Sequence, residues 1–448
     1  MKFAALNVAA LTCALFASNA PAQDLLSLHQ AALRHDATWL AARAAAEAGR
    51  EKLPQARAQL LPSLTANANT AENDSSVRYD NGGTGQAVDS DRRYSSRGYG
   101  ATLAQPVFRA QNFVGYSVAR LQVEEAELRL RLAEQDLALR VAQAYFDVLL
   151  AQDNLAFVNA QKAAIEEQWQ VAKRSFELGT VTITDANEAE ARLDIVRAQE
   201  IAAQSDLEIK QNILAQMTGL PSDDLATLAD DFAPEMPAPA DLQWWLDRTQ
   251  TQNLGIEIQR RLHAIGQREV RRQRAGHLPT VDIVGSYNNT HADGGTLTTS
   301  PNDTESTSLS LQLQLPIFQG GAQQSRVREA LANRARAEQD AEQAQRTAAV
   351  QTRQAFLGVV NGRAQVAALE RALRSSESAL KSNQVGLEVG VRTGVDVLNA
   401  QQQLFNAKRD LAQARYSFLI NLMRLRAATA ELSEPELQAL NKYFVSRK

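Results

Sequence analysis

The stretch SLSLQLQL at residues 308–315 places a leucine at every second position, with serine or glutamine between. Strict alternation over this length predicts a β-strand with one apolar and one polar face. Similar but weaker faces occur in two other segments, at Val281, Ile283 and Tyr287 and at Tyr99, Ala101 and Leu103. The remainder of the chain is predicted to be long helix, which offers no core to cover these apolar faces. The pattern therefore favours strands whose apolar side faces lipid.

Four such strands are predicted, at about residues 63–75, 95–108, 279–290 and 306–318. The segments that join the members of each pair, 73–93 and 288–305, are polar and rich in Gly, Asn, Asp and Ser, as expected for outward-facing loops. Four strands cannot close a barrel, and open sheet edges are not tolerated in lipid. We therefore expect several copies to close one barrel, and three copies would give about twelve strands.

Two very long helices are predicted at about 111–177 and 323–388, because neither segment contains proline and both are rich in Ala, Gln, Glu, Arg and Leu. At about 1.5 Å per residue, each would span on the order of 100 Å. Apolar residues spaced by three and four predict a coiled-coil seam, at Val366, Leu369, Leu373, Leu404, Ala407, Leu411, Ala414 and Phe418. Periodicity alone would favour an ordinary elongated coiled coil.

The second half of the chain repeats the first. LGTVTITD at 178–185 returns as VGVRTGVD at 389–396. A repeat this long indicates a duplicated domain. We expect a first repeat at 23–220, a proline-containing linker at 221–241, a second repeat at 242–430, and a tail at 431–448 that packs with the linker.

Residues 1–22 are predicted to be a signal peptide, with Lys2, an apolar run, and Ala20-Pro21-Ala22 as the cleavage site. The only cysteine, Cys13, lies in this segment and lacks the preceding small residue of a lipoprotein site, so lipidation is not expected. The formal net charge of −4 gives no support for nucleic-acid binding.

No arrangement of residues suggests an enzyme. The five histidines are scattered, and no phosphate-binding loop or nucleophile elbow is found. We therefore expect neither catalysis nor a cofactor nor a metal site. A soluble periplasmic coiled-coil adaptor or scaffold remains an alternative, but it would not explain two strand pairs in equivalent places.

Several motifs together resemble the family of TolC-like outer-membrane efflux proteins, the outer-membrane factors of tripartite efflux and type I secretion systems. They are GHLPT at 276–280, LPIFQGG at 315–321, VGVRTGVDVL at 389–398 and YSFLIN at 416–421. The resemblance implies a homotrimer with a twelve-stranded barrel in the outer membrane and a helical tunnel in the periplasm. It also implies a periplasmic adaptor (membrane fusion protein) and an inner-membrane pump of the RND or ABC type as partners. Drugs, toxic solutes or secreted proteins would be the cargo.

The resemblance further implies a gate at the helix tips. Arg392 would tether to Thr184 and Asp185 on the neighbouring helix pair, and Asp396 would form an acidic ring at the constriction. A second acidic ring would fall at Asn399, which is neutral here, and a latching tyrosine would fall at Leu387. The constriction is therefore expected to be less acidic and less firmly latched than in the family's best-known form.

The same residues have a simpler interpretation. Thr393 and Asp396 have the spacing of a capping box, and carboxylates are stabilised in a first helical turn. The three tip glycines, Gly179, Gly390 and Gly394, are predicted to allow positive φ in the turns.

Overall fold

The computed structural model describes residues 23–81, 86–229, 231–295 and 300–445, so the predicted signal peptide lies outside the described residues. The chain divides into two compact units. The first contains residues 1–40, 135–245 and 352–448, and the second contains 41–134 and 246–351. None of the described helices is long and apolar enough to cross a membrane.

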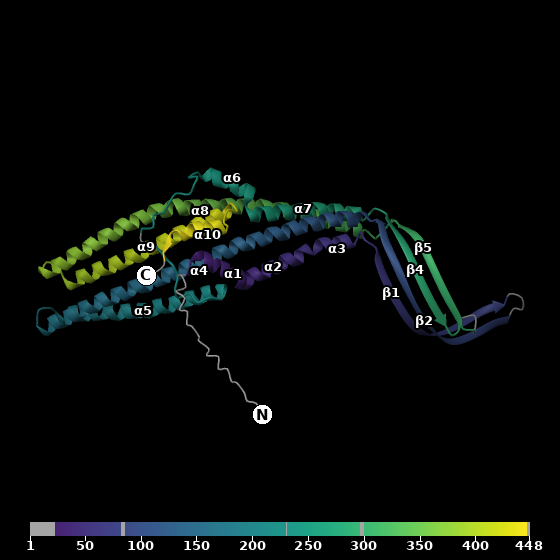
Figure 1. The fold of residues 1–448 in the computed structure, drawn as a ribbon, viewed down its shortest axis with the longest axis horizontal. Coiled ribbons are helices and arrows are strands. Elements are labelled where there is room, and N and C mark those ends of the chain that lie inside the picture. The colour runs from purple at the N-terminus through teal and green to yellow at the C-terminus, as the bar shows by residue number, and fades with distance from the viewer. Residues whose placement is uncertain (1–22, 82–85, 230, 296–299, 446–448) are drawn as a thin grey trace, which may run out of the picture. The chain divides into compact units, whose positions relative to one another are not determined.

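The elements follow one another in nearly the same order in both halves of the chain (Figure 1). In the first half they are α1 (Leu25–His35), α2 (Ala37–Arg50), α3 (Lys52–Ala58), β1 (Ser63–Asn81), β2 (Gln86–Phe108), α4 (Ala110–Glu177) and α5 (Ile183–Thr218). In the second they are β3 (Thr227–Leu228), α6 (Leu242–Gln252), α7 (Leu254–Ala275), β4 (Thr280–Ala292), β5 (Asn302–Gln314), α8 (Ala322–Glu388), α9 (Gly394–Ala428), α10 (Glu434–Asn441) and β6 (Phe444–Val445).

The second unit contains an antiparallel sheet in the order β1-β2-β4-β5, so β1 and β5 are its edges. Register places Ile283 opposite Leu311 and Val281 opposite Leu313, which brings the alternating apolar residues of β4 and β5 onto one face. Leu309, Leu311 and Leu313 are 80 %, 70 % and 70 % exposed within the chain. The predicted apolar face is therefore present and uncovered.

The predicted loop at 73–93 is largely wrong. β1 continues to Asn81 and β2 begins at Gln86, beyond the predicted limits of 75 and 95. Cross-strand ion pairs hold this polar ribbon together, with Arg78 Nε 2.5 Å from Asp89 Oδ1 and Arg93 Nη2 3.0 Å from Asp74 Oδ2. The polar composition of residues 73–93 suggests a loop, but side chains of opposite charge that face each other across a strand pair also stabilise a β-hairpin.

The second hairpin is also shifted from its predicted limits. β4 extends to Ala292, and β5 begins at Asn302 and ends at Gln314 rather than at 318. Much of the predicted loop at 288–305 is therefore strand. Pro316, which has no N–H to donate to a ladder, follows soon after the end of β5.

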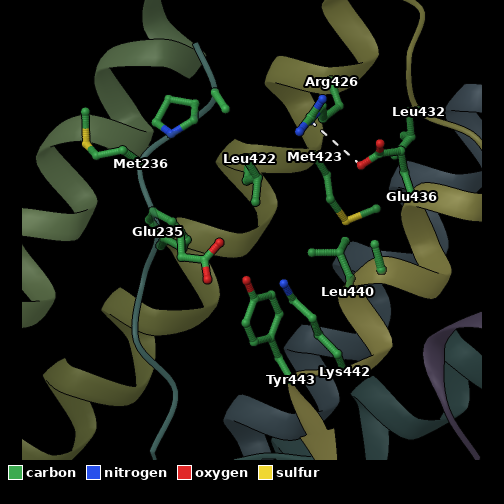
Figure 2. A pocket seen from close by; sticks show the side chains of 14 residues that line it. Glu235, Met236, Leu422, Met423, Arg426, Leu432, Glu436, Leu440, Lys442 and Tyr443 are labelled. Carbon is green, nitrogen blue, oxygen red and sulfur yellow. Dashed lines mark ion pairs between the residues drawn. The ribbon is translucent and has the colours of Figure 1, made fainter. Parts of the chain in front are cut away.

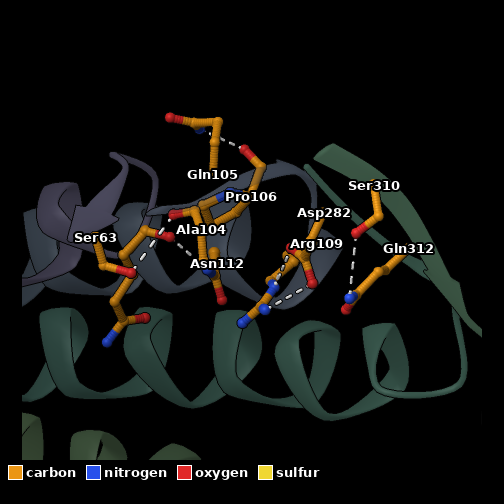
Figure 3. Close-up of polar contacts among 10 residues, drawn as sticks. Ser63, Ala104, Gln105, Pro106, Arg109, Asn112, Asp282, Ser310 and Gln312 are labelled. Carbon is orange, nitrogen blue, oxygen red and sulfur yellow. Dashed lines mark hydrogen bonds and ion pairs between the residues drawn. The ribbon is translucent and has the colours of Figure 1, made fainter. Parts of the chain in front are cut away.

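Polar contacts fix the strand-to-helix junctions of this unit (Figure 3). Arg109, between β2 and α4, donates to both carboxylate oxygens of Asp282 in β4, at 2.8 and 2.7 Å. Asn112 Nδ2 donates to the carbonyl of Gln59 at 2.6 Å. A paired guanidinium and carboxylate give a fixed geometry that a single charge cannot.

The first unit has its core where its helices meet the short β3–β6 ladder. Tyr145 in α4 is fully buried and donates to the carbonyl of Ala226 at 2.5 Å, next to β3. Its equivalent in the repeat, Phe356, is also buried in this cluster. The pairing of Thr227 with Val445 confirms that the linker and the tail pack together.

The break between α1 and α2 lies at Asp36, whose carboxylate accepts the N–H of Trp39 at 2.7 Å and caps the second helix. The same carboxylate accepts two hydrogen bonds from Arg140, at 2.9 and 3.0 Å. Hydrogen bonding from Arg140 is the main reason that the pKa of Asp36 is lowered. The N-terminal helices are thereby joined to α4 by a bidentate ion pair.

Beside this core is a shallow cavity of about 170 Å³ between the linker, α9 and α10 (Figure 2). Arg426 lines it and lies 3.8 Å from Glu436 and 3.0 Å from Glu431. Met236, Met423 and Tyr443 also line it. Lys442 Nζ, also in the lining, lies 4.6 Å from the centroid of the Tyr443 ring, so charged groups of this cavity contact other parts of its wall, and we assign it no binding role.

His29 in α1 gives a prediction on stability. It is 4 % exposed, and neither ring nitrogen has a hydrogen-bond partner in the described part of the chain. Burial lowers its pKa, and the nearby Glu434 opposes this only in part. The unfolded chain binds this proton near pH 6.5, so stability should fall as pH drops below about 6.5, by at most about 1.4 kcal/mol per pH unit.

Denaturant midpoints measured in detergent between about pH 7.5 and about pH 5.5 would check this. His29→Gln should flatten the pH dependence, whereas the matched variant His277→Gln, at an exposed position, should leave it unchanged. An equal slope in wild type and His29→Gln would contradict the assignment.

Candidate functional site at the hairpin tips

Two helical hairpins of the first unit carry the predicted gate residues. α4 and α5 form the first hairpin, and α8 and α9 form the second. In the first turn the N–H groups of Gly179 and Thr180 donate to the carbonyls of Phe176 and Ser175, at 2.9 and 2.8 Å. In the second turn Gly390 and Val391 donate to Leu387 and Gly386, at 3.1 and 2.9 Å. Both helices therefore end in the same Schellman motif.

Gly179 and Gly390 have φ values of +74° and +79°, which confirms their predicted role. The prediction for Gly394 is wrong, because this residue is not in the positive-φ region and instead begins α9. Thr393 before it has the extended backbone of an N-cap, with φ −99° and ψ 161°. The turn between α8 and α9 therefore ends before Gly394, one residue earlier than the position of this glycine suggested.

Each second helix begins with a complete capping box. Thr393 Oγ1 accepts the N–H of Asp396 at 3.2 Å, while Asp396 Oδ2 accepts the N–H of Thr393 at 3.0 Å. Thr182 and Asp185 repeat this arrangement at 3.3 and 3.1 Å. The capping interpretation of Asp396 is confirmed. Thr182 was missed, although it has the same spacing to Asp185 as Thr393 has to Asp396.

The cap stabilises the ionised form of the Asp396 carboxylate. Its pKa is lowered chiefly by the hydrogen bond from the Thr393 backbone, then by that from the Thr393 hydroxyl, with a smaller effect of the Arg392 charge. Only Oδ2 takes part in these hydrogen bonds. Asp396 Oδ1 takes no part in the cap, so the carboxylate can attract cations from solvent while Oδ2 caps the helix.

A cavity of about 620 Å³ lies between the two tips. Asp185 and Arg392 both line it, together with Leu387 and Leu398. Within the described residues no ion pair joins Arg392 to Asp185, so the predicted tether is not formed inside one chain. Thr184 lies exposed in the first turn of α5.

Gly386 allows Arg392 to fold back on α8. A Cβ atom at Gly386 would lie 2.6 Å from Arg392 Cγ, which is closer than real side chains approach. The backbone N–H of Arg392 also donates to the carbonyl of Gly386 at 3.0 Å. The position of Arg392 at the tip is thus set by a glycine that the sequence did not single out.

Further along the hairpins, side chains connect the two halves of the repeat. Leu398 of α9 is buried in an apolar cluster with Val158, Ile165 and Leu193 from the first hairpin. Gln161 Nε2 donates to Gln402 Oε1 at 2.7 Å, and Arg192 Nη2 donates to Asn399 Oδ1 at 3.0 Å. Sequence reasoning missed Arg192, Gln161 and Gln402, because partners more than 200 residues apart leave no local pattern.

The coiled-coil seam is confirmed in the second hairpin, where Val366 packs with Leu411 and Ala414. Leu369 and Leu373 extend the same cluster. No group of three or more His, Cys, Asp or Glu side chains able to hold a metal was found in residues 23–445, the masked positions excepted. The tips are therefore a site of helix contact and charge.

Solved structures with this fold are outer-membrane channels. The Campylobacter jejuni CmeC outer membrane channel has a TM-score of 0.78 at 16 % identity and covers 94 % of this chain and 89 % of its own. The Vibrio cholerae outer membrane protein VceC has a TM-score of 0.74 at 20 % identity, with 90 % and 96 % covered. The chain therefore shares the fold of these two outer-membrane proteins.

The sequence comparisons identify the family. The family model of outer membrane efflux proteins matches residues 28–220 and 249–431. The Dickeya chrysanthemi proteases secretion protein PrtF is 31 % identical, covering 96 % of this chain and 93 % of the relative. The Escherichia coli outer membrane protein TolC is 31 % identical, covering 95 % and 86 %. The chain belongs to the outer membrane efflux protein family.

As a member of this family the protein is an exit channel of the outer membrane. The predicted resemblance is confirmed, and the alternative of a soluble periplasmic scaffold is set aside. The family consists of outer-membrane channels rather than enzymes.

The N-caps give a prediction that depends only on this geometry. Thr393→Ala removes the hydroxyl that accepts the Asp396 N–H and that helps to keep the Asp396 carboxylate ionised. Amide exchange in the first turn of α9 should accelerate about fivefold, the usual effect of a lost N-cap. Hydrogen exchange read by mass spectrometry would measure it.

Thr393→Ser, which keeps the hydroxyl, is the matched control and should exchange like wild type. Thr182→Ala should accelerate exchange at the start of α5 and leave α9 unchanged. Equal exchange in Thr393→Ala and Thr393→Ser would show that the cap contributes nothing.

Proposed function

We propose that three copies of this chain form one export conduit, with a twelve-stranded barrel in the outer membrane and a helical tunnel reaching into the periplasm. The observation that carries this proposal is the sheet itself. Its exposed leucines suit lipid, and its edge strands β1 and β5 have no further partner among the described strands of one chain. Open edges are not stable in lipid, so further copies must supply the missing neighbours.

The conduit works with a periplasmic adaptor and an inner-membrane pump of the RND or ABC type. Support comes from relatives named for export, including the alkaline protease secretion protein AprF of Pseudomonas aeruginosa and the outer membrane efflux protein BepC of Brucella suis. Such names cover both secreted proteins and small molecules. We infer that the pump, rather than this chain, selects drugs, toxic solutes or secreted proteins as cargo.

The hairpin tips form the periplasmic gate. Asp396 of each copy contributes to an acidic ring at the constriction, and Arg392 tethers the second hairpin to Thr184 and Asp185 of a neighbouring helix pair. The cavity between the tips supports this role, because Arg392 and Asp185 both face it without an ion pair inside the chain. The Arg392 guanidinium and the Asp185 carboxylate are thus available to form ion pairs with a neighbouring copy of the chain or with the tip of a periplasmic adaptor.

The lipid-facing role of the sheet can be tested at Leu311. Leu311→Arg should prevent stable assembly in the membrane, because an arginine near the bilayer midplane of a barrel costs about 2–4 kcal/mol. Heat-modifiable migration of outer-membrane fractions would measure the assembled form.

Gln312→Arg places the same charge on the opposite face of the same strand and is the matched control. It should assemble nearly normally, since that face is polar. Equal loss in both variants would indicate a general defect of the strand, and normal assembly of Leu311→Arg would refute the lipid-facing assignment.

The gate can be tested by single-channel recording of the purified protein in planar bilayers. Arg392→Ser should raise the conductance severalfold, because it removes a cation that ties two hairpins together. Asp396→Asn should weaken cation selectivity and block by divalent cations, since the ring loses its charge.

Arg274→Ser, at the end of α7, removes an equal charge far along the chain from the tips and serves as the control. Unchanged conductance in Arg392→Ser would place the constriction elsewhere. A correctly folded oligomer without any conductance would refute the proposed conduit.

A further inference from the structure

Arg192 occupies a position at the tips that the gate described above does not use. It lies on α5 of the first hairpin and is partly buried, with 27 % of its side chain exposed. Its Nη2 donates to Glu188 Oε1 at 2.9 Å and to Asn399 Oδ1 at 3.0 Å. One guanidinium therefore neutralises an acid on its own helix and binds a neutral side chain on the other hairpin.

The partner Asn399 lies beside the acidic residue of the proposed ring. Asp396 and Asn399 are three residues apart in the first turns of α9, so their side chains are neighbours on the helix surface. Asn399 is exposed within the chain, whereas Val397, Leu398 and Ala400 around it are buried. The surface of α9 that contains Asp396 thus continues to Asn399, which accepts a hydrogen bond from the Arg192 guanidinium.

We propose that Arg192 is a specificity-determining residue of this channel, acting as a built-in counter-cation at the constriction. It neutralises Glu188 and covers Asn399, and so keeps Glu188 from adding to the negative charge that Asp396 and Asp185 already give the tip. The inference rests on the proposed gate at Asp396 and extends it to a residue on the other hairpin.

The electrostatic argument depends on Glu188. While Arg192 is present, this carboxylate has an opposite charge within 2.9 Å and attracts solvent cations only weakly. Without the guanidinium, each chain presents an additional unpaired acid near the Asn399 amide oxygen. Because symmetry repeats this in every copy of a ring, the effect on a cation at the axis is multiplied.

The contact also constrains the hairpins. A hydrogen bond to a charged donor is stronger than a neutral one, and this one joins α5 to α9. If the Arg192–Asn399 hydrogen bond were purely structural, breaking it would change the conductance, but the change would not depend on whether Glu188 carries a charge. Block by divalent cations therefore separates the two roles.

The test is single-channel recording of the full-length oligomer with Mg²⁺ added on the tip side. Arg192→Gln should lower the Mg²⁺ concentration for half-block by roughly three- to tenfold and increase cation selectivity. Arg192→Gln combined with Glu188→Gln should return the half-block concentration to near the wild-type value, since the exposed acid is removed.

Arg197→Gln is the matched control. Arg197 lies on the same helix and pairs with Asp194 at 3.1 Å and Glu166 at 3.9 Å, both within the first hairpin. Its loss changes the net charge equally but does not affect the contact with α9. It should leave the block unchanged.

Asn399→Asp gives a second test that retains the contact. Arg192 would then be shared between Glu188 and the new carboxylate, so the half-block concentration should fall about as far as in Arg192→Gln, and should fall further when Arg192→Gln is added. No further fall when Arg192→Gln is added to Asn399→Asp, or equal block in Arg192→Gln and Arg197→Gln, would overturn the role of Arg192 while the channel stands. Absence of conductance in the wild-type oligomer would overturn both proposals.

Discussion

The backbone hydrogen-bonding groups along β1 and β5 set the main constraint on this molecule. Each edge of the four-stranded sheet has a row of N–H and C=O groups for which the described strands of one chain provide no neighbour. In water such an edge can be solvated, but in hydrocarbon each unpaired group costs several kcal/mol. The exposed leucines of β5 mark the sheet for lipid, so the chain is incomplete as a single copy. Assembly is therefore a condition of the fold rather than an addition to it.

Duplication within the chain sets a second constraint. The two hairpin tips have the same backbone conformation, a Schellman turn followed by a Thr-x-x-Asp capping box, but they differ in their side chains. Thr180 in the first turn corresponds to Val391 in the second, and only the second tip carries an arginine before its N-cap. The shared backbone satisfies the terminal N–H and C=O groups of both tips in the same way, and the side-chain differences give the two tips unequal charge. The capping box also favours the ionised form of Asp396, because its hydrogen bonds lower the pKa of the carboxyl.

Most of the fold could be predicted from the sequence because its signals are local. Proline-free segments of helix formers became α4 and α8, within one residue of the predicted limits at each end. The alternating leucines became β5, on the face expected. The limits of β1 and β2 could not be predicted, since their outer parts depend on cross-strand pairs such as Arg78 with Asp89 rather than on apolar alternation. Gly394 was misassigned because a glycine pattern alone does not distinguish a turn residue from the first residue of the next helix.

The candidate site was predictable only in part, for a related physical reason. Residues near a turn leave a local signature, and Thr393 with Asp396 was found by its spacing. Arg192 leaves none, because its partner Asn399 lies on the other hairpin and the residues between them fold separately. A sequence therefore shows which charges a constriction contains but not which of them are already neutralised. Asn399 illustrates the difference, since the sequence shows only that it is neutral, whereas the structure shows that the Arg192 guanidinium lies beside it. The effective charge of such a gate is a property of side-chain pairs between hairpins, and it cannot be obtained by counting acidic residues along one helix.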